Sequence, residues 1–159
     1  MKYSRRDLGF LLPTALAAAA KAQSVASETS AAPAASGNSI EKLPVMKTGD
    51  YKYDDLPVTT NGRNKQRRMF TAKTHTGFKI ESHMSDIAPG EVNHPPHHHL
   101  REEMMLVREG VMELTISGVP HRLGAGDVGV IGSNEVHNAK NVGTVVAKYF
   151  IVNIGRDDV

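Results

Sequence analysis

The chain has 159 residues, of which 40% are hydrophobic and 23% are charged, and its formal net charge is +2. These values allow one packed globular domain, and so small a charge, without a basic stripe among aromatics, excludes an obvious nucleic-acid partner. Cysteine is absent, which excludes disulfides, thiol catalysis and thiolate zinc sites.

The first segment, residues 1–22, has the composition of an export signal. A basic start is followed by a short apolar run and by small residues at Ala20 and Ala22, the plan of a cleaved secretory signal. The pair Arg5 and Arg6 resembles the twin-arginine export signal. We therefore expect a periplasmic or secreted protein with no stable membrane span after processing. The alternative is an uncleaved N-terminal helix or anchor.

The next segment, residues 23–41, is rich in alanine, serine, glycine and proline. Such a composition has little to bury and predicts a flexible linker. The composition becomes globular from about Lys42, so we expect a single β domain over residues 42–159. Its first part, up to Arg68, contains many turn signals, and we expect it to wrap around the outside of the domain.

From Met69 onward, short runs of β-branched and apolar residues alternate with turn residues. The predicted strands lie at residues 78–86, 103–108, 111–117, 127–131 and 144–154. Glu109-Gly110 is a tight hairpin signal between the second and third of these strands. No helical periodicity extends beyond about two turns after the leader. Many short strands at regular spacing predict an all-β sandwich or barrel.

A histidine-rich segment carries the chemistry. Side chains two residues apart on an extended chain point the same way, so His97 and His99 share a face, and Glu103 returns to it four residues later. His137 offers another imidazole from a distant strand. Three imidazoles and one carboxylate suit a divalent Fe, Mn, Ni, Cu or Zn ion. Glu102 is the alternative to Glu103 as the acidic ligand.

These residues resemble the two motifs of the cupin superfamily. The first motif is matched by Gly90, His97, His99, Glu103 and Gly110, with one extra residue before His97. The second is matched by Gly126, His137 and Asn141, while Gly132 and Asn134 stand in its usual proline-x-glycine turn. The resemblance implies a single-domain cupin, a double-stranded β-helix (jelly-roll) barrel, with one metal held by the three histidines and Glu103.

The remaining histidines have simpler interpretations. His98 alternates to the opposite face and is expected not to bind metal, and His94 is a loop residue or lines the mouth of the site. His75, His83 and His121 are interpreted as surface or strand residues. One of the two methionines after Glu103 must face the interior. Five apolar residues are candidate pocket or core walls: Val107, Leu114, Ile131, Phe150 and Val152.

Function is less sharply indicated than the site. The leading hypothesis is a metal-dependent, dioxygenase-like oxidoreductase acting on a small organic molecule, with Glu103 also able to accept a substrate proton. The first alternative is a non-redox isomerase, lyase or hydrolase acting on a sugar or hydroxy acid. The second is a non-catalytic module that binds metal or a small ligand. A homodimer is plausible because a small barrel has sheet edges to cover.

Overall fold

Nine β-strands and two short 3-10 helices make up residues 40–156, the part of the chain that the computed structural model describes. The predicted export signal at residues 1–22, and the predicted linker up to residue 39, lie outside the described residues. The helices are η1 (Ile40–Lys42) and η2 (Tyr53–Asp55). The strands are β1 (Val58–Asn61), β2 (Asn64–Lys73), β3 (Lys79–Ile87), β4 (Glu102–Glu109), β5 (Met112–Ile116), β6 (Val119–Leu123), β7 (Val128–Ile131), β8 (His137–Asn141) and β9 (Ala147–Gly155).

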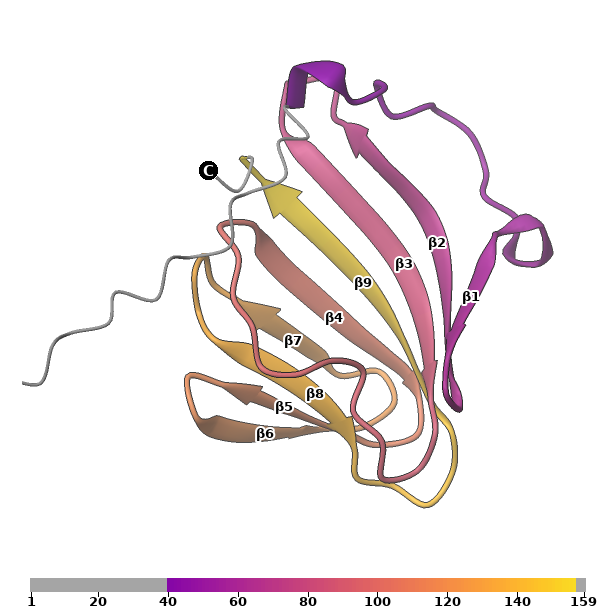
Figure 1. Cartoon of the computed structure of the whole chain (residues 1–159), viewed down its shortest axis with the longest axis vertical. Coiled ribbons are helices and arrows are strands. Elements are labelled where there is room, and N and C mark those ends of the chain that lie inside the picture. Colours follow the sequence, from indigo (N-terminus) through magenta and orange to yellow (C-terminus); the bar gives the residue numbers. More distant parts are fainter. Residues whose placement is uncertain (1–39, 157–159) are drawn as a thin grey trace, which may run out of the picture. The chain divides into compact units, whose positions relative to one another are not determined.

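The strands form two sheets that enclose one core (Figure 1). The larger has the order β1-β2-β3-β9-β4-β7, and the smaller has the order β6-β5-β8. The described neighbours within each sheet pair in antiparallel fashion. β9 therefore lies in the middle of the larger sheet, although it follows every other strand along the chain. The predicted all-β jelly-roll fold is confirmed.

Alternation along the central strands decides which side chains enter the barrel. In β4, Met105 is 1% exposed whereas Met104 is 50% exposed, as expected for neighbours on opposite faces of a sheet. Across the β4–β9 pair Glu103 lies opposite Asn153, and Met105 lies opposite Ile151. The inner face thus places polar side chains at one level of the barrel and apolar side chains at the next.

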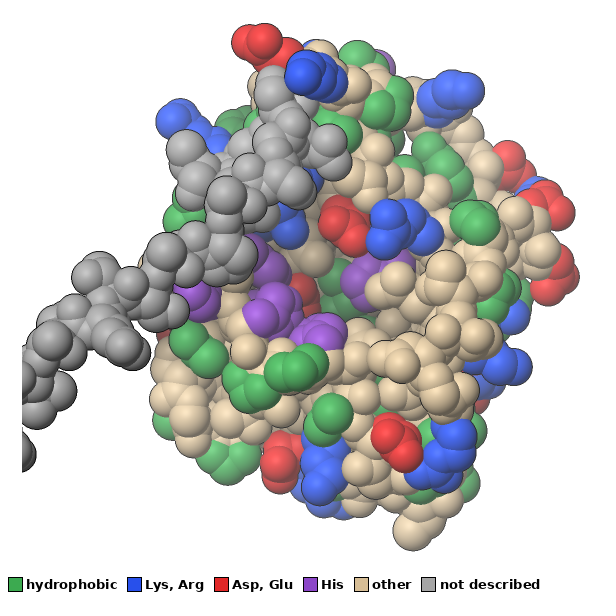
Figure 2. All heavy atoms as spheres, in the orientation of Figure 1, with side chains coloured by type: hydrophobic (Ala, Val, Ile, Leu, Met, Phe, Trp, Pro, Cys, Tyr) green, Lys and Arg blue, Asp and Glu red, His purple; other side chains and the backbone are tan. Residues whose placement is uncertain are grey.

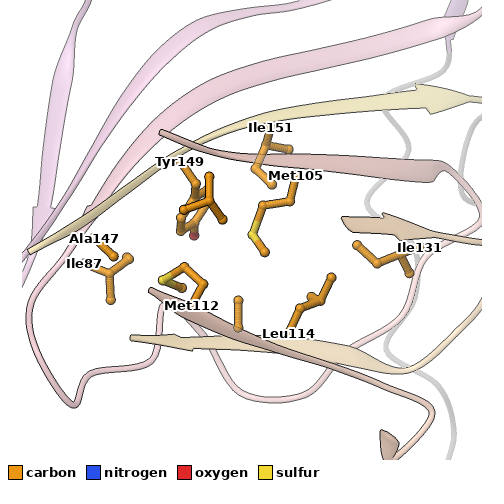
Figure 3. Packing of buried hydrophobic residues seen from close by; sticks show 10 residues of the cluster. Ile87, Met105, Met112, Leu114, Ile131, Ala147, Tyr149 and Ile151 are labelled. Carbon is orange, nitrogen blue, oxygen red and sulfur yellow. The ribbon is translucent and has the colours of Figure 1, made fainter. Parts of the chain in front are cut away.

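The core fills the apolar end of this inner face. Its buried residues come from both sheets and include Met105, Met112, Leu114 and Ile151 (Figure 3). Three of the five predicted wall residues, Val107, Leu114 and Ile131, belong to this cluster. The other two, Phe150 and Val152, are half-buried and alternate with the inward Tyr149 and Ile151, so they lie on the opposite face of the sheet.

The turn at Gly110 does not make the predicted hairpin. β4 pairs with β7 and β9, whereas β5 pairs with β6 and β8, so this turn carries the chain from one sheet to the other. Gly110 has φ +79°, and a Cβ atom there would lie 2.8 Å from the Cα atom of Ala147. The glycine is needed for both the turn and this close approach.

The prediction that residues 42–68 only wrap the outside is wrong in part. β1 and the first half of β2 fall in this range and extend the larger sheet at one edge. The Asn61-Gly62 turn signal marks the β1–β2 hairpin, with Asn61 paired to Asn64. Polar residues dominate both strands, which hid the alternation. Within residues 40–156, no helix is long and apolar enough to cross a membrane.

Candidate metal centre

Three imidazoles converge at one end of the barrel. His97, His99 and His137 can each offer a ring nitrogen, and these atoms all lie within 4.8 Å of one another. His97 and His99 lie in the segment before β4, whereas His137 begins β8 in the smaller sheet. The ring centroids of His97 and His137 are 4.4 Å apart, and those of His99 and His137 are 5.0 Å apart.

Main-chain hydrogen bonds explain how residues forty positions apart come together. The His97 amide donates to the His137 carbonyl at 3.1 Å, and the His137 amide donates back to the His97 carbonyl at 2.8 Å. Further along, the Asn93 amide donates to the Ala139 carbonyl. The histidine segment therefore runs alongside β8 as an irregular extra strand of the smaller sheet.

Two of the imidazoles are held in a metal-ready orientation. His99 Nδ1 lies 2.8 Å from the Arg101 carbonyl, and His137 Nδ1 lies 2.8 Å from the Glu135 carbonyl. Because a carbonyl can only accept, each Nδ1 carries the proton and donates, which leaves the Nε2 lone pair free. Among the described residues neither Nε2 atom has a hydrogen-bond partner, although both are buried. This donor set fits a divalent ion.

Glu103 lies beside the three histidines at the start of β4. Its Oε2 atom is 3.4 Å from His99 Nε2 and 3.8 Å from His137 Nε2, and its side chain is 12% exposed. Glu102, the alternative ligand, is exposed and pairs across the sheet with Ile154, on the outer face. The geometry thus places Glu103, and not Glu102, at the candidate site.

The titratable groups of the cluster have pKa values that are shifted in different directions. Burial, together with the neighbouring histidines, lowers the pKa of His97 to about 4, so this imidazole is neutral at physiological pH. The Glu103 carboxylate, 3.4 Å from His99 Nε2, raises the pKa of His99. Burial works to raise the pKa of Glu103, but His99 and His137 beside it lower that pKa overall.

The other histidines divide between the site and the surface. His98 is exposed and its Nδ1 atom is 2.8 Å from the Asn134 side chain. The Asn134 amide also donates to the His99 carbonyl, so these contacts tie the two motif segments together. His94 packs edge-on against His97 with ring centroids 4.1 Å apart. His121 lies exposed on β6.

A cleft of about 390 Å³ opens over the cluster, with histidine side chains grouped around a hollow (Figure 2). Its walls include His97, His99, Glu103, His94, Glu81, His83 and Asn153. A smaller cavity of about 20 Å³ lies between His83, Glu103 and His137, enough for one water-sized group. From the sequence His83 was interpreted as a surface or strand residue, and its spacing of two residues from Glu81 is the signal that could have placed both side chains in the cleft.

Asn141 contributes to the frame of the site and not to its lining. Its side-chain amide donates to the carbonyls of Ile87 and Val145 at 2.8 Å, and its Oδ1 atom accepts from the Gly143 amide. The residue is fully buried. It fixes the turn between β8 and β9 against the end of β3.

Known proteins share this architecture. Residues 83–153 match the family described as Cupin domain. KdgF from a Halomonas species is 16% identical, with 70% of this chain and 97% of that chain covered and a TM-score of 0.58. An RmlC-like cupin from Shewanella frigidimarina is 16% identical, with 65% of this chain and 86% of that chain covered and a TM-score of 0.54. The polyketide cyclase RemF from Streptomyces resistomycificus is 19% identical, with 69% of this chain and 79% of that chain covered and a TM-score of 0.54. No curated protein matches significantly.

The domain match and the structural neighbours support the cupin superfamily for this barrel. At such low identities the likeness to the solved structures shows the fold alone. The histidine cluster is observed in the structure of this chain itself, and it could hold a metal ion.

Proposed function

We propose that this protein is a metal-dependent enzyme that acts on a small organic molecule. His97, His99, His137 and Glu103 hold one divalent ion. The observation that carries the proposal is the convergence of three imidazole nitrogens within 4.8 Å of one another, beside a 390 Å³ cleft that His97 and His99 line. A purely structural site would be closed, whereas this one faces a space that a small molecule can enter.

The reaction proposed first is a dioxygenase-like oxidation. A bound divalent ion of a redox-active metal would supply Lewis acidity and electron transfer beside the cleft. Glu103 can accept a proton from a substrate group, because its carboxylate is ionised and buried beside the cleft. His97 is neutral and therefore available as a ligand throughout the physiological range. The fold neighbours do not point to one reaction, since they include a polyketide cyclase and a sugar phosphate isomerase.

The test begins with elemental analysis of natively purified protein, followed by substrate screening with and without dioxygen. One equivalent of iron, manganese, nickel or copper and strictly oxygen-dependent turnover would support the oxidative reaction. Zinc, which has no redox chemistry, together with equal aerobic and anaerobic turnover, would overturn it in favour of a non-redox enzyme. Tight ligand binding without any turnover would favour a binding module.

Export forms a separate part of the proposal. The twin-arginine-like sequence around Arg5 and Arg6 supports a periplasmic or secreted location after removal of residues 1–22. Cell fractionation should find the wild type outside the cytoplasm, with a new N-terminus near residue 23. Replacing both arginines by lysine should retain the protein inside the cell, and unchanged export of this variant would contradict the twin-arginine route.

A homodimer is also part of the proposal. The outer face of the larger sheet carries exposed apolar side chains, and Met104 pairs across the sheet with Val130. Apolar faces of this kind are typical of association surfaces. Light scattering should give twice the mass of one chain, and Val130→Glu should reduce the mass to that of a monomer. A monomeric wild type would refute association through this face.

A further inference from the structure

A row of polar side chains crosses the inner face of the larger sheet opposite the histidines. In the strand register Glu81 of β3 lies opposite Asn153 of β9, and Asn153 lies opposite Glu103 of β4. His83, two residues after Glu81, points to the same side of β3. Glu81, His83, Asn153 and Glu103 all line the 390 Å³ cleft.

Two members of this row are buried without partners. His83 is 8% exposed and Asn153 is 6% exposed. Within residues 40–156, no hydrogen-bond partner is present for His83 Nδ1 or for Asn153 Oδ1. Buried polar atoms are nearly always hydrogen-bonded, because an unpaired one costs about 1–3 kcal/mol. Two such atoms on one wall of a cleft indicate that a ligand completes the hydrogen bonding.

The space beside the row has the right size for a small polar group. His83, Glu103 and His137 all line the cavity of about 20 Å³ that lies next to the cleft. That volume accommodates a single oxygen atom with its hydrogens, and not a methyl-bearing chain. A group in this cavity therefore lies between the candidate metal ligands and His83.

We propose that His83 and Asn153, with Glu81 at the rim, form a subsite for the hydroxyl groups of a polyhydroxylated small molecule whose other end faces the metal. This assignment rests on the proposed metal-dependent function and names the substrate class of the same site. His83 and Asn153 are binding residues, and neither is assigned a step in the reaction.

Hydroxyl groups fit this wall better than other polar groups. The Asn153 oxygen and the Glu81 carboxylate can only accept hydrogen bonds, so the ligand must donate to them. A neutral imidazole has one donor and one acceptor nitrogen, and burial lowers the pKa of His83, which favours this neutral form. A hydroxyl both donates and accepts and can therefore satisfy every position, whereas an ammonium group can only donate. A hydrocarbon chain would leave all of these atoms unpaired.

The test compares two carboxylates of equal chain length on zinc-loaded protein. D-Gluconate carries hydroxyl groups along its whole chain, whereas 2-hydroxyhexanoate carries only the one next to its carboxylate, so both present the same metal-binding group to the ion. Isothermal titration calorimetry should show gluconate binding at least about tenfold more tightly than 2-hydroxyhexanoate, since each buried hydrogen bond is worth roughly 1 kcal/mol. The ratio should fall to about one in Asn153→Leu and in His83→Phe, which keep the side-chain volume and remove the polar atoms.

The control is Asn138→Leu, the same substitution on β8 at a half-buried position that lines neither the cleft nor the cavity. It should retain the preference for gluconate. All variants are first titrated with zinc and must bind one equivalent, so a misfolded variant is recognised. Equal affinities in the wild type, or a preference that survives in both His83→Phe and Asn153→Leu, would overturn the subsite and leave the metal site standing. If the wild type fails to bind zinc, the proposed function fails at that first titration and takes the subsite with it.

Discussion

At the scale of single residues, hydrogen bonds to the ring nitrogens that face away from the candidate metal position orient two of the imidazoles. The Nδ1 atoms of His99 and His137 donate to main-chain carbonyls, so neither ring can rotate without losing a hydrogen bond. The rings are thus oriented before any ion arrives, and less conformational freedom is lost when it binds. His97 differs, because its position depends on main-chain pairing with β8.

Removing one imidazole tests whether the cluster is a metal site. His137→Ala should lower the metal affinity by more than about 100-fold, because even loss of a group behind a ligand costs 10- to 100-fold. Metal per chain after native purification, measured by elemental analysis, should fall from about one equivalent to near zero. His121→Ala is the control, since this histidine lies exposed on β6. Equal metal content in the two variants would count against the site.

Acid should weaken metal binding through His99. Its pKa is raised because Glu103 stabilises the protonated form, and the metal must displace that proton. The affinity should therefore begin to fall somewhat above pH 6.5 and decrease about tenfold per pH unit below the raised pKa. His97, with a pKa of about 4, adds a second loss only in stronger acid. Calorimetric titrations between pH 8 and 5 measure this, and a flat profile would refute it.

At the scale of elements, the turn between β4 and β5 joins the two sheets. Gly110 and Gly118 both have positive φ, +79° and +81°, but only at Gly110 would a Cβ atom collide with Ala147. Gly118→Ala should cost about 1–2 kcal/mol from backbone strain alone, and Gly110→Ala should cost about 1–3 kcal/mol more from overpacking. Denaturant unfolding of the two variants gives the difference, and equal stabilities would show that the close approach is not restrictive.

The strands of the barrel were predictable where apolar and β-branched residues form short runs between turn residues. Residues 103–108 and 144–154 were recognised as such runs and residues 78–86 by their alternation, and the spacing of His97, His99 and Glu103 placed these three on one side. The β1–β2 hairpin was missed because polar residues occupy both of its faces. Pairing was predictable only where a short turn implied it, and at Gly110 that inference failed because the turn crosses between sheets.

The candidate site was predictable in its ligands and not in its walls. The cupin motifs supplied His97, His99, Glu103 and His137, and the structure brings these side chains together. His83 and Asn153 carry no motif, and they enter the cleft because β9 inserts between β3 and β4. Which residues lie side by side on adjacent strands depends on the order of the strands in the sheet, and this order cannot be predicted from a single sequence.

At the scale of the whole molecule, metal binding and folding are coupled. The three clustered histidines come from two segments about forty residues apart in the sequence, so the complete site exists only in the folded chain. Metal at 100 times its dissociation constant should stabilise the fold by about 2.7 kcal/mol, raising Tm by several degrees. Thermal unfolding with and without metal measures the shift. His137→Ala should show almost none, and an equal shift in that variant would indicate binding elsewhere.

The central place of β9 has a consequence for the order of events in the cell. During synthesis β3 and β4 leave the ribosome before β9. Because β9 lies between them in the sheet, the facing edges of β3 and β4 remain unpaired until it emerges. The barrel cannot close, and the Glu103 side of the site has no Asn153 beside it, until this strand emerges. Ribosome-bound chains ending at residue 146 should therefore remain protease-sensitive, whereas chains with residues 147–155 outside the tunnel should become resistant. Folding of this barrel therefore waits until β9 has left the ribosome.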